Sequence, residues 1–196
     1  MAKNGKPRGR KLPDVLTEEE RLVLLKQPNR RAPTGLRNLC MIRLMLNAGL
    51  RSSEVLNLKV NDLDWMSGKL AVRQGKGQKD RILWINEGDF ELLKSWRERR
   101  PEQSDLLFTT LQGRPVLDRY LRAMVKRVAD KAGIEKRVHP HLLRHSFATD
   151  LYRETKNIRL VQKALGHEDL STTMIYTHII DDELEDALRN FRNGTG

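Results

Sequence analysis

The chain has 196 residues, of which 38% are hydrophobic and 32% charged, and its formal net charge at pH 7 is +11. This length suits one domain with a core of its own, and the positive charge favours an anionic partner, either nucleic acid or an acidic membrane surface. The pattern argues against a membrane-spanning helix and a secretory signal, because no apolar run approaches the roughly 20 residues that cross a bilayer and none follows the basic N-terminus. The single cysteine, Cys40, cannot form an internal disulfide, so we expect a cytoplasmic protein.

Residues 1–15 are expected to form a basic, flexible arm ahead of one domain over residues 16–196. The first part of this arm carries cations and no acid, and the cations are Lys3, Lys6, Arg8, Arg10 and Lys11. Such a segment is either a solvated tail or an arm that contacts a polyanion, and the sequence leaves both open.

Helical signals follow the arm. Thr17 with Glu20 three residues later is a capping box and predicts that a helix begins there. Residues 34–49 predict a second helix that ends near Gly49 and buries Cys40; its apolar stripe is Leu39, Ile42, Met45 and Leu46.

The hydrophobic period changes between residues 58 and 85. The runs 69–74 and 79–85 read as strands joined by the glycine-flanked turn GKGQ, and a run near 57–63 suggests a third strand. Caps and breakers then predict helices over 86–100, 117–133, 139–154, 157–166 and 181–191, with one or two turns over 170–178. We therefore expect a mainly helical α+β domain with one small antiparallel three-stranded sheet.

The segment HPHLLRHSFAT is the first candidate for chemistry. His141, Arg144 and His145 are spaced i, i+3 and i+4, so they share one face of a helix. Arginine offers a planar fork that matches two phosphate oxygens, although a solvated face with incidental histidines has the same pattern. The histidines, which include His139, lack the HExxH spacing and an acidic or cysteine partner, so we expect no metal and no cofactor.

Two further motifs are weak when each is taken alone. In GLRSSEVLNL, Arg51 follows a helix-ending glycine, and Glu54 could hold its guanidinium toward a cleft, but a surface ion pair is equally compatible. In GKGQKDR, Lys76 stands at a hairpin tip, where an ordinary exposed lysine is also expected. The GxxxxGK[ST] spacing of a phosphate-binding loop is absent.

The segment LGHEDLSTTMIYTH places His167 after a helix-ending glycine and Tyr176 nine residues further on. A tyrosine hydroxyl is a weak nucleophile at neutral pH, because its pKa is about 10. Chemistry at Tyr176 would therefore need other groups to activate the bond that it attacks. The alternative is a buried tyrosine with a hydrogen-bonded hydroxyl.

Taken together, the order arginine, lysine, HxxR, histidine, tyrosine resembles the tyrosine recombinase or phage integrase family, in particular its Xer-type and integrase-like members. The resemblance covers residues from about Leu16 to His178 and implies the helical catalytic domain of that family. It implies that Arg51 and Arg144 bind the non-bridging oxygens of a scissile DNA phosphate. His141 and His167 would add hydrogen bonds, and Glu54 would support the arginines.

The resemblance also implies the covalent step. Tyr176 would attack phosphorus and form a 3′-phosphotyrosyl link, while Lys76 would protonate the leaving 5′ oxygen, with Lys79 as the second candidate for that role. Fixed donors neutralise the phosphate, and the covalent link conserves the bond for rejoining, so neither metal nor ATP is expected.

The implied function is site-specific recombination of double-stranded DNA by a nucleoid-associated enzyme. Relaxation of DNA in the manner of type IB topoisomerases, or DNA binding without catalysis, are the alternatives. We expect that the separate N-terminal core-binding domain of many members has no counterpart in residues 1–196. The expected terminal helix, residues 182–193, would dock on a neighbouring protomer in a tetramer on DNA or pack on its own domain; its apolar face is Leu184, Ala187, Leu188 and Phe191.

Overall fold

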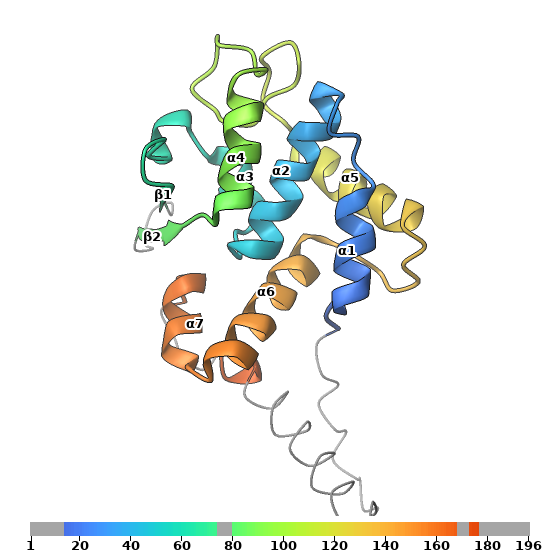
Figure 1. Ribbon diagram of the computed structural model, residues 1–196, viewed down its shortest axis with the longest axis vertical. Coiled ribbons are helices and arrows are strands. Elements are labelled where there is room, and N and C mark those ends of the chain that lie inside the picture. The colour runs from blue at the N-terminus through green and yellow to red at the C-terminus, as the bar shows by residue number, and fades with distance from the viewer. Residues whose placement is uncertain (1–13, 74–79, 168–172, 177–196) are drawn as a thin grey trace, which may run out of the picture.

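The computed structural model describes residues 14–73, 80–167 and 173–176. These residues form a mainly helical domain with one β-hairpin, shown in Figure 1. The elements in chain order are α1 (Glu18–Lys26), α2 (Pro33–Asn47), α3 (Ser52–Asn57), the 3₁₀ turn η1 (Val60–Asp62), β1 (Lys69–Val72), β2 (Arg81–Trp84), α4 (Glu87–Arg97), α5 (Asp118–Lys131), α6 (Pro140–Thr155), α7 (Ile158–Leu165) and the 3₁₀ turn η3 (Met174–Tyr176). The expected arm and the expected terminal helix lie outside the described residues, apart from Asp14 and Val15.

Helix α2 forms the centre of the main core, because it is apolar on most of its circumference. It packs against α4 and α6, and in Figure 1 it lies between α4 and α1 above the start of α6. Leu39, Ile42 and Met45 of the predicted stripe are each 2% exposed or less. Cys40 is a buried free thiol, so this prediction is confirmed.

The sheet consists of β1 and β2 paired antiparallel, with Lys69 opposite Trp84 and Val72 opposite Arg81. The predicted third strand is wrong in the described structure, where residues 57–63 hold the end of α3, the turn η1 and a single bridge from Leu63 to Leu70. The reason is local, since the carboxylate of Asp62 accepts a bond from the Lys59 backbone N–H at 2.8 Å and closes a 3₁₀ turn.

The predicted helix starts are confirmed by their caps. Thr17 and Glu20 form the reciprocal capping box of α1, and the side chains of Asn86 and Asn157 cap α4 and α7. Helix α7 ends at Gly166, whose φ of 66° is in the left-handed region that favours glycine. These caps fix where α7 stops and therefore where the next residue, His167, is placed.

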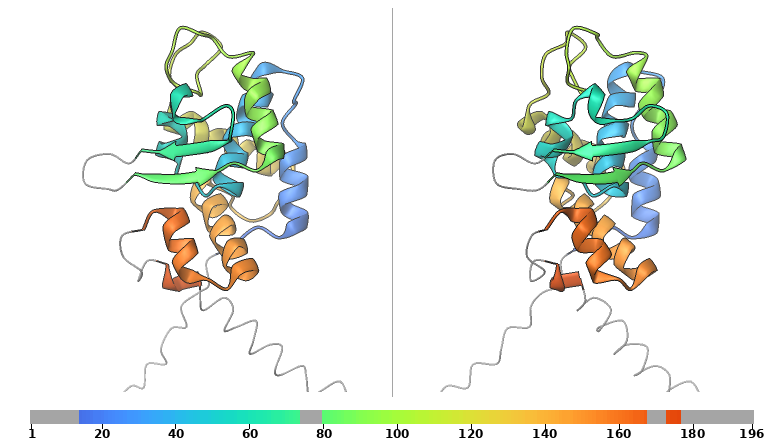
Figure 2. Two further views of the ribbon diagram at one scale, coloured as in Figure 1. Left: turned by 60° about the vertical axis from the view of Figure 1, so that its left-hand side comes forward. Right: turned by 90° about the vertical axis from the view of Figure 1, so that its left-hand side faces the viewer.

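Helices α6 and α7 form a lower layer beneath the hairpin and α2. Figure 2 shows the two strands side by side, with α7 directly below β2. Gly49, in the link from α2 to α3, allows α6 to approach closely, because a Cβ there would lie 2.3 Å from the Phe147 ring. None of the helices in the described ranges is both long and apolar enough to cross a bilayer.

Candidate active site

A buried carboxylate lies at the centre of the site. Glu54 of α3 is 8% exposed and accepts the Arg51 backbone N–H at 2.7 Å and the Arg51 Nη1 at 2.8 Å. Arg81 of β2 donates to both of its oxygens, at 2.7 and 2.9 Å, and Arg144 Nη1 lies 3.7 Å away. Burial raises the pKa of Glu54, but the bonds and charge of Arg81, aided by Arg51 and Arg144, outweigh it and lower the pKa to about 2.

Arg81 is the residue of this cluster that the sequence reasoning missed. Its side chain is buried, and its Nε donates to the carbonyl of Ala164 at 2.8 Å, near the end of α7. It therefore ties α3, β2 and α7 together through one guanidinium. Its signal in the sequence is faint: it is a cation at an inward position of a short strand, where an apolar residue is the usual choice.

Arg144 of α6 is 5% exposed and is held by backbone carbonyls from two other segments. Its Nη1 donates to Gly49 O at 2.5 Å and its Nη2 to Leu165 O at 2.8 Å. Burial, followed by the charge of Arg51, lowers its pKa to about 10, so the guanidinium stays charged at neutral pH. Arg51 and Arg144 therefore lie near the same carboxylate, that of Glu54, where α6 packs on α2.

His167 contacts the same guanidinium. Arg144 Nη2 lies 3.1 Å from His167 Nε2, and arginine can only donate, so Nε2 is the acceptor. The proton then lies on Nδ1, which donates to Thr173 Oγ1 at 2.9 Å. Burial and the charges of Arg144 and Arg51 lower the pKa of His167 to about 4, so the ring is neutral at pH 7.

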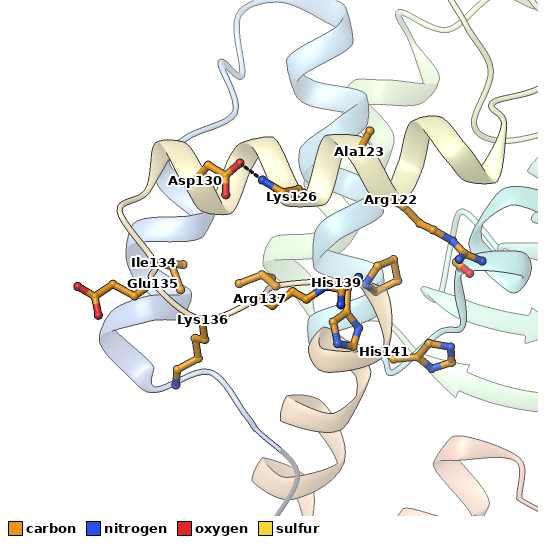
Figure 3. A pocket seen from close by; sticks show the side chains of 13 residues that line it. Arg122, Ala123, Lys126, Asp130, Ile134, Glu135, Lys136, Arg137, His139 and His141 are labelled. Atoms are coloured by element: carbon orange, nitrogen blue, oxygen red, sulfur yellow. Dashed lines mark hydrogen bonds and ion pairs between the residues drawn. The ribbon is translucent and has the colours of Figure 1, made fainter.

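His141 lies in the first turn of α6 and is exposed. It lines a cavity between α5 and the start of α6, together with Arg122, Arg137 and His139. In Figure 3, His141 projects from the start of α6 to the same side as the guanidinium of Arg122. It stands one helical turn before Arg144, and its ring is open to a ligand.

Tyr176 of η3 is 2% exposed, and its ring packs in a second apolar cluster formed with Ala148, Val161 and Leu165. Its hydroxyl lies 2.7 Å from Nδ1 of His145. Burial raises the pKa of Tyr176 to about 12, although the nearby charge of Arg144 opposes the shift. In this structure Tyr176 is thus a buried tyrosine with a hydrogen-bonded hydroxyl, which is the alternative to a nucleophile that the sequence also allowed. It lies near Arg144 of the arginine cluster, which consists of Arg51, Arg81 and Arg144.

The described residues therefore bring Arg51, Glu54, Arg144 and His167 into one network and leave His141 at its edge. Three guanidiniums around one carboxylate leave positive charge in excess at a partly open site, which suits a phosphate anion. Lys76 and Lys79 lie outside the described residues. The part of the chain that the structure describes contains no group of three or more histidine, cysteine or acidic side chains placed to hold a metal ion.

The fold is similar to solved recombinase structures. XerA recombinase superposes with a TM-score of 0.80 at 33% identity, over 93% of this chain and 66% of the other. The XerH site-specific recombinase, bound to a palindromic difH substrate in a post-cleavage complex, also gives 0.80, at 37% identity over 96% of this chain and 56% of the other. These matches confirm the mainly helical catalytic-domain fold.

Sequence comparison agrees with the structural one. Tyrosine recombinase XerD of Staphylococcus saprophyticus is 38% identical over 188 residues, which are 93% of this chain and 63% of that protein. Residues 14–183 match the phage integrase family. The chain therefore belongs to the phage integrase family, and it spans less than two thirds of the length of these relatives.

Proposed function

We propose that this chain is the catalytic part of a site-specific DNA recombinase, which cleaves and rejoins strands through a 3′-phosphotyrosyl intermediate. The observation that carries the proposal is the pair Arg51 and Arg144, fixed around Glu54 next to Tyr176. Family membership supports it, as do the similar XerH structures, which were solved on DNA before and after cleavage.

Arg51 and Arg144 would bind the two non-bridging oxygens of the scissile phosphate. Arg144 is held by three partners, whereas the side chain of Arg51 is 28% exposed and pairs with Glu54. Donors that are fixed before the reaction stabilise the extra charge of the transition state without reorganisation. One such donor is worth about 10²- to 10³-fold in rate.

His167 and His141 would complete the phosphate site. His167 Nε2 lies beside the guanidinium of Arg144, so an incoming phosphate oxygen would meet both groups. The negative charge would raise the pKa of His167 and favour a donating imidazolium in place of the neutral ring. His141 is exposed at the start of α6, where it can approach the same phosphate and assist proton transfer.

Tyr176 would attack phosphorus, and Lys76 would protonate the leaving 5′ oxygen, with Lys79 as the second candidate. Both lysines belong to the segment between β1 and β2. The first residue of β2, Arg81, is anchored in the site by its bonds to Glu54. A positioned proton donor contributes about 10²- to 10⁴-fold. This division of roles requires neither a metal ion nor ATP.

The partner would be double-stranded DNA, in keeping with the net charge of +11. The catalytic domain would comprise residues 16–196 behind a basic arm. Its start is supported by Leu16, which is 1% exposed and whose N–H donates to Ser146 at 2.9 Å. Residues 182–193 would join protomers into a tetramer on DNA, in the cytoplasm at the nucleoid.

The test uses nicked suicide duplexes with a randomised sequence, from which covalent complexes that resist denaturation are recovered. We expect adducts with the unaltered chain and none with Tyr176→Phe, while Tyr152→Phe, a matched change on α6, retains them. Adducts that persist in Tyr176→Phe would refute the assigned nucleophile. Relaxation of any supercoiled DNA, without selected sites, would favour the topoisomerase-like alternative, and DNA binding with no adduct would favour a binding module.

A further inference from the structure

His145 has no part in the roles proposed above, yet it makes the one side-chain hydrogen bond that the described structure gives to the hydroxyl of Tyr176. Its Nδ1 lies 2.7 Å from that hydroxyl, and the two rings are 5.8 Å apart at 50°. His145 follows Arg144 on α6, and its ring contacts Tyr176 instead of joining the arginine as the expected shared face had suggested. The tyrosine is thus bonded to a group outside the arginine cluster.

The protonation states of both groups follow from their environment. Burial, followed by the charges of His141, Arg144 and His139, lowers the pKa of His145, which favours the neutral ring at pH 7. Burial likewise keeps Tyr176 protonated. A neutral imidazole has one acceptor nitrogen, and when its proton lies on Nε2 that acceptor is Nδ1, to which the hydroxyl of Tyr176 can donate.

The position of the hydroxyl is not one from which it can react. A nucleophile must come within about 3–3.5 Å of its target atom, and a phosphorus on duplex DNA stays outside the protein surface. Tyr176 is 2% exposed, with its ring among the apolar side chains of α6 and α7. The tyrosine must therefore leave this cluster before it can attack, and the bond to His145 breaks when it leaves.

We propose that His145 is a positioning residue that stores Tyr176: its Nδ1 accepts the hydroxyl and holds the unreacted nucleophile in the cluster of Ala148, Val161 and Leu165. The proposal rests on the assignment of Tyr176 as nucleophile. The competing role for the same contact is that of a base that takes the tyrosine proton during attack. The two roles predict opposite effects on the rate of cleavage. Loss of a contact that holds the tyrosine releases it and speeds cleavage, whereas loss of a base slows cleavage.

Two substitutions separate the hydrogen bond from the ring contact. His145→Phe keeps an aromatic ring against Tyr176 but has no acceptor, whereas His145→Asn keeps an acceptor oxygen near the position of Nδ1. The first readout needs no DNA: nitration of tyrosine by tetranitromethane, measured on proteolytic peptides by mass spectrometry. Tyr152, which is partly exposed on α6, is the internal reference.

We expect His145→Phe to increase the nitration of Tyr176 relative to Tyr152 by about two- to tenfold. This range corresponds to the net free energy of one hydrogen bond. His145→Asn should restore most of the protection. On suicide DNA in single turnover, His145→Phe should form adduct faster by a similar factor. Unchanged nitration in His145→Phe would overturn the proposal, and so would slower adduct formation that Asn does not rescue.

The failure of this proposal differs from the failure of the proposed function. If Tyr176 is not the nucleophile, adducts persist in Tyr176→Phe, which involves no change at His145. If His145 does not store the tyrosine, adducts still require Tyr176, but the nitration ratio does not respond to the loss of the acceptor.

Discussion

Replacement of Arg81 by methionine removes the guanidinium that binds both oxygens of Glu54 and keeps most of the side-chain length. The ion pair is buried on both sides, since each side chain is 6% exposed, so solvent does not screen it. The change leaves Glu54 with Arg51 and with Arg144 at 3.7 Å, and leaves the carbonyl of Ala164 without its donor. Breaking one side of a buried pair typically costs about 3–5 kcal/mol.

The pKa of Glu54 gives an independent value for the free energy with which its partners stabilise the fold. It falls from its ordinary value of 4.5 to about 2 in the folded protein, and Arg81 is the main cause of the lowering. At about 1.4 kcal/mol per pKa unit, this corresponds to roughly 3 kcal/mol. Because the folded pKa is depressed, this stability is fully present above pH 4.5 and is lost as the pH falls toward 2.

The assay is urea unfolding at pH 7 and at steps down to pH 3, followed by circular dichroism. We expect Arg81→Met to lose about 3 kcal/mol of unfolding free energy at pH 7, and the difference from the unaltered chain to shrink as the pH is lowered. The control is Arg73→Met, since Arg73 binds Asp62 at 2.7 Å with a side chain that is 68% exposed. That loss should stay below about 1 kcal/mol.

Two results would refute this reasoning. One is a loss in Arg81→Met as small as that in Arg73→Met, which would mean that the buried pair contributes no more than a surface pair. The other is a loss that does not change with pH, which would mean that the charge of Glu54 is not what Arg81 stabilises.

Three further predictions concern the supports of the site. Gly49→Ala should lower the melting temperature, because its Cβ would collide with Phe147 at 2.3 Å and φ is +65°; thermal unfolding measures it, and an unchanged melting temperature would contradict the close approach of α6. His167→Gln should lessen the stability that is lost as the pH falls from 6.5 to 4. The unaltered chain loses stability there because the folded pKa of about 4 lets the unfolded chain bind more protons in that window. Equal pH profiles from urea unfolding would contradict this. Cys40 should resist alkylation at pH 8 until urea unfolds the chain, because burial raises its thiol pKa to about 12; rapid alkylation of the folded protein, measured by mass, would count against this.

Much of the fold could be predicted from local signals. The capping box at Thr17, the cap at Asn157 and the glycine at 166 each satisfy backbone groups within a few residues, so the sequence carries their whole cause. The predicted third strand is wrong for an equally local reason, because Asp62 closes a turn within the run near 57–63 that suggested a strand. Such side-chain competition is easily overlooked when periodicity alone is read.

The site could be predicted only in part, because its partners are distant in sequence. The pairing of Arg51 with Glu54 lies within one helical turn and was expected, and the structure has it. Arg81 meets Glu54 across 27 positions, and the meeting depends on which face of β2 points inward. The bond from Tyr176 to His145 spans 31 positions and depends on the docking of η3 against α6, which no local signal encodes.

The most direct test of the central proposal is identification of the residue that becomes linked to DNA. Adducts trapped on suicide duplexes are digested with protease and nuclease, and the peptide that carries a nucleotide is sequenced by mass spectrometry. The account predicts a 3′-phosphate ester on the hydroxyl of Tyr176. A nucleotide on another residue, or a link through the 5′-phosphate, would contradict it.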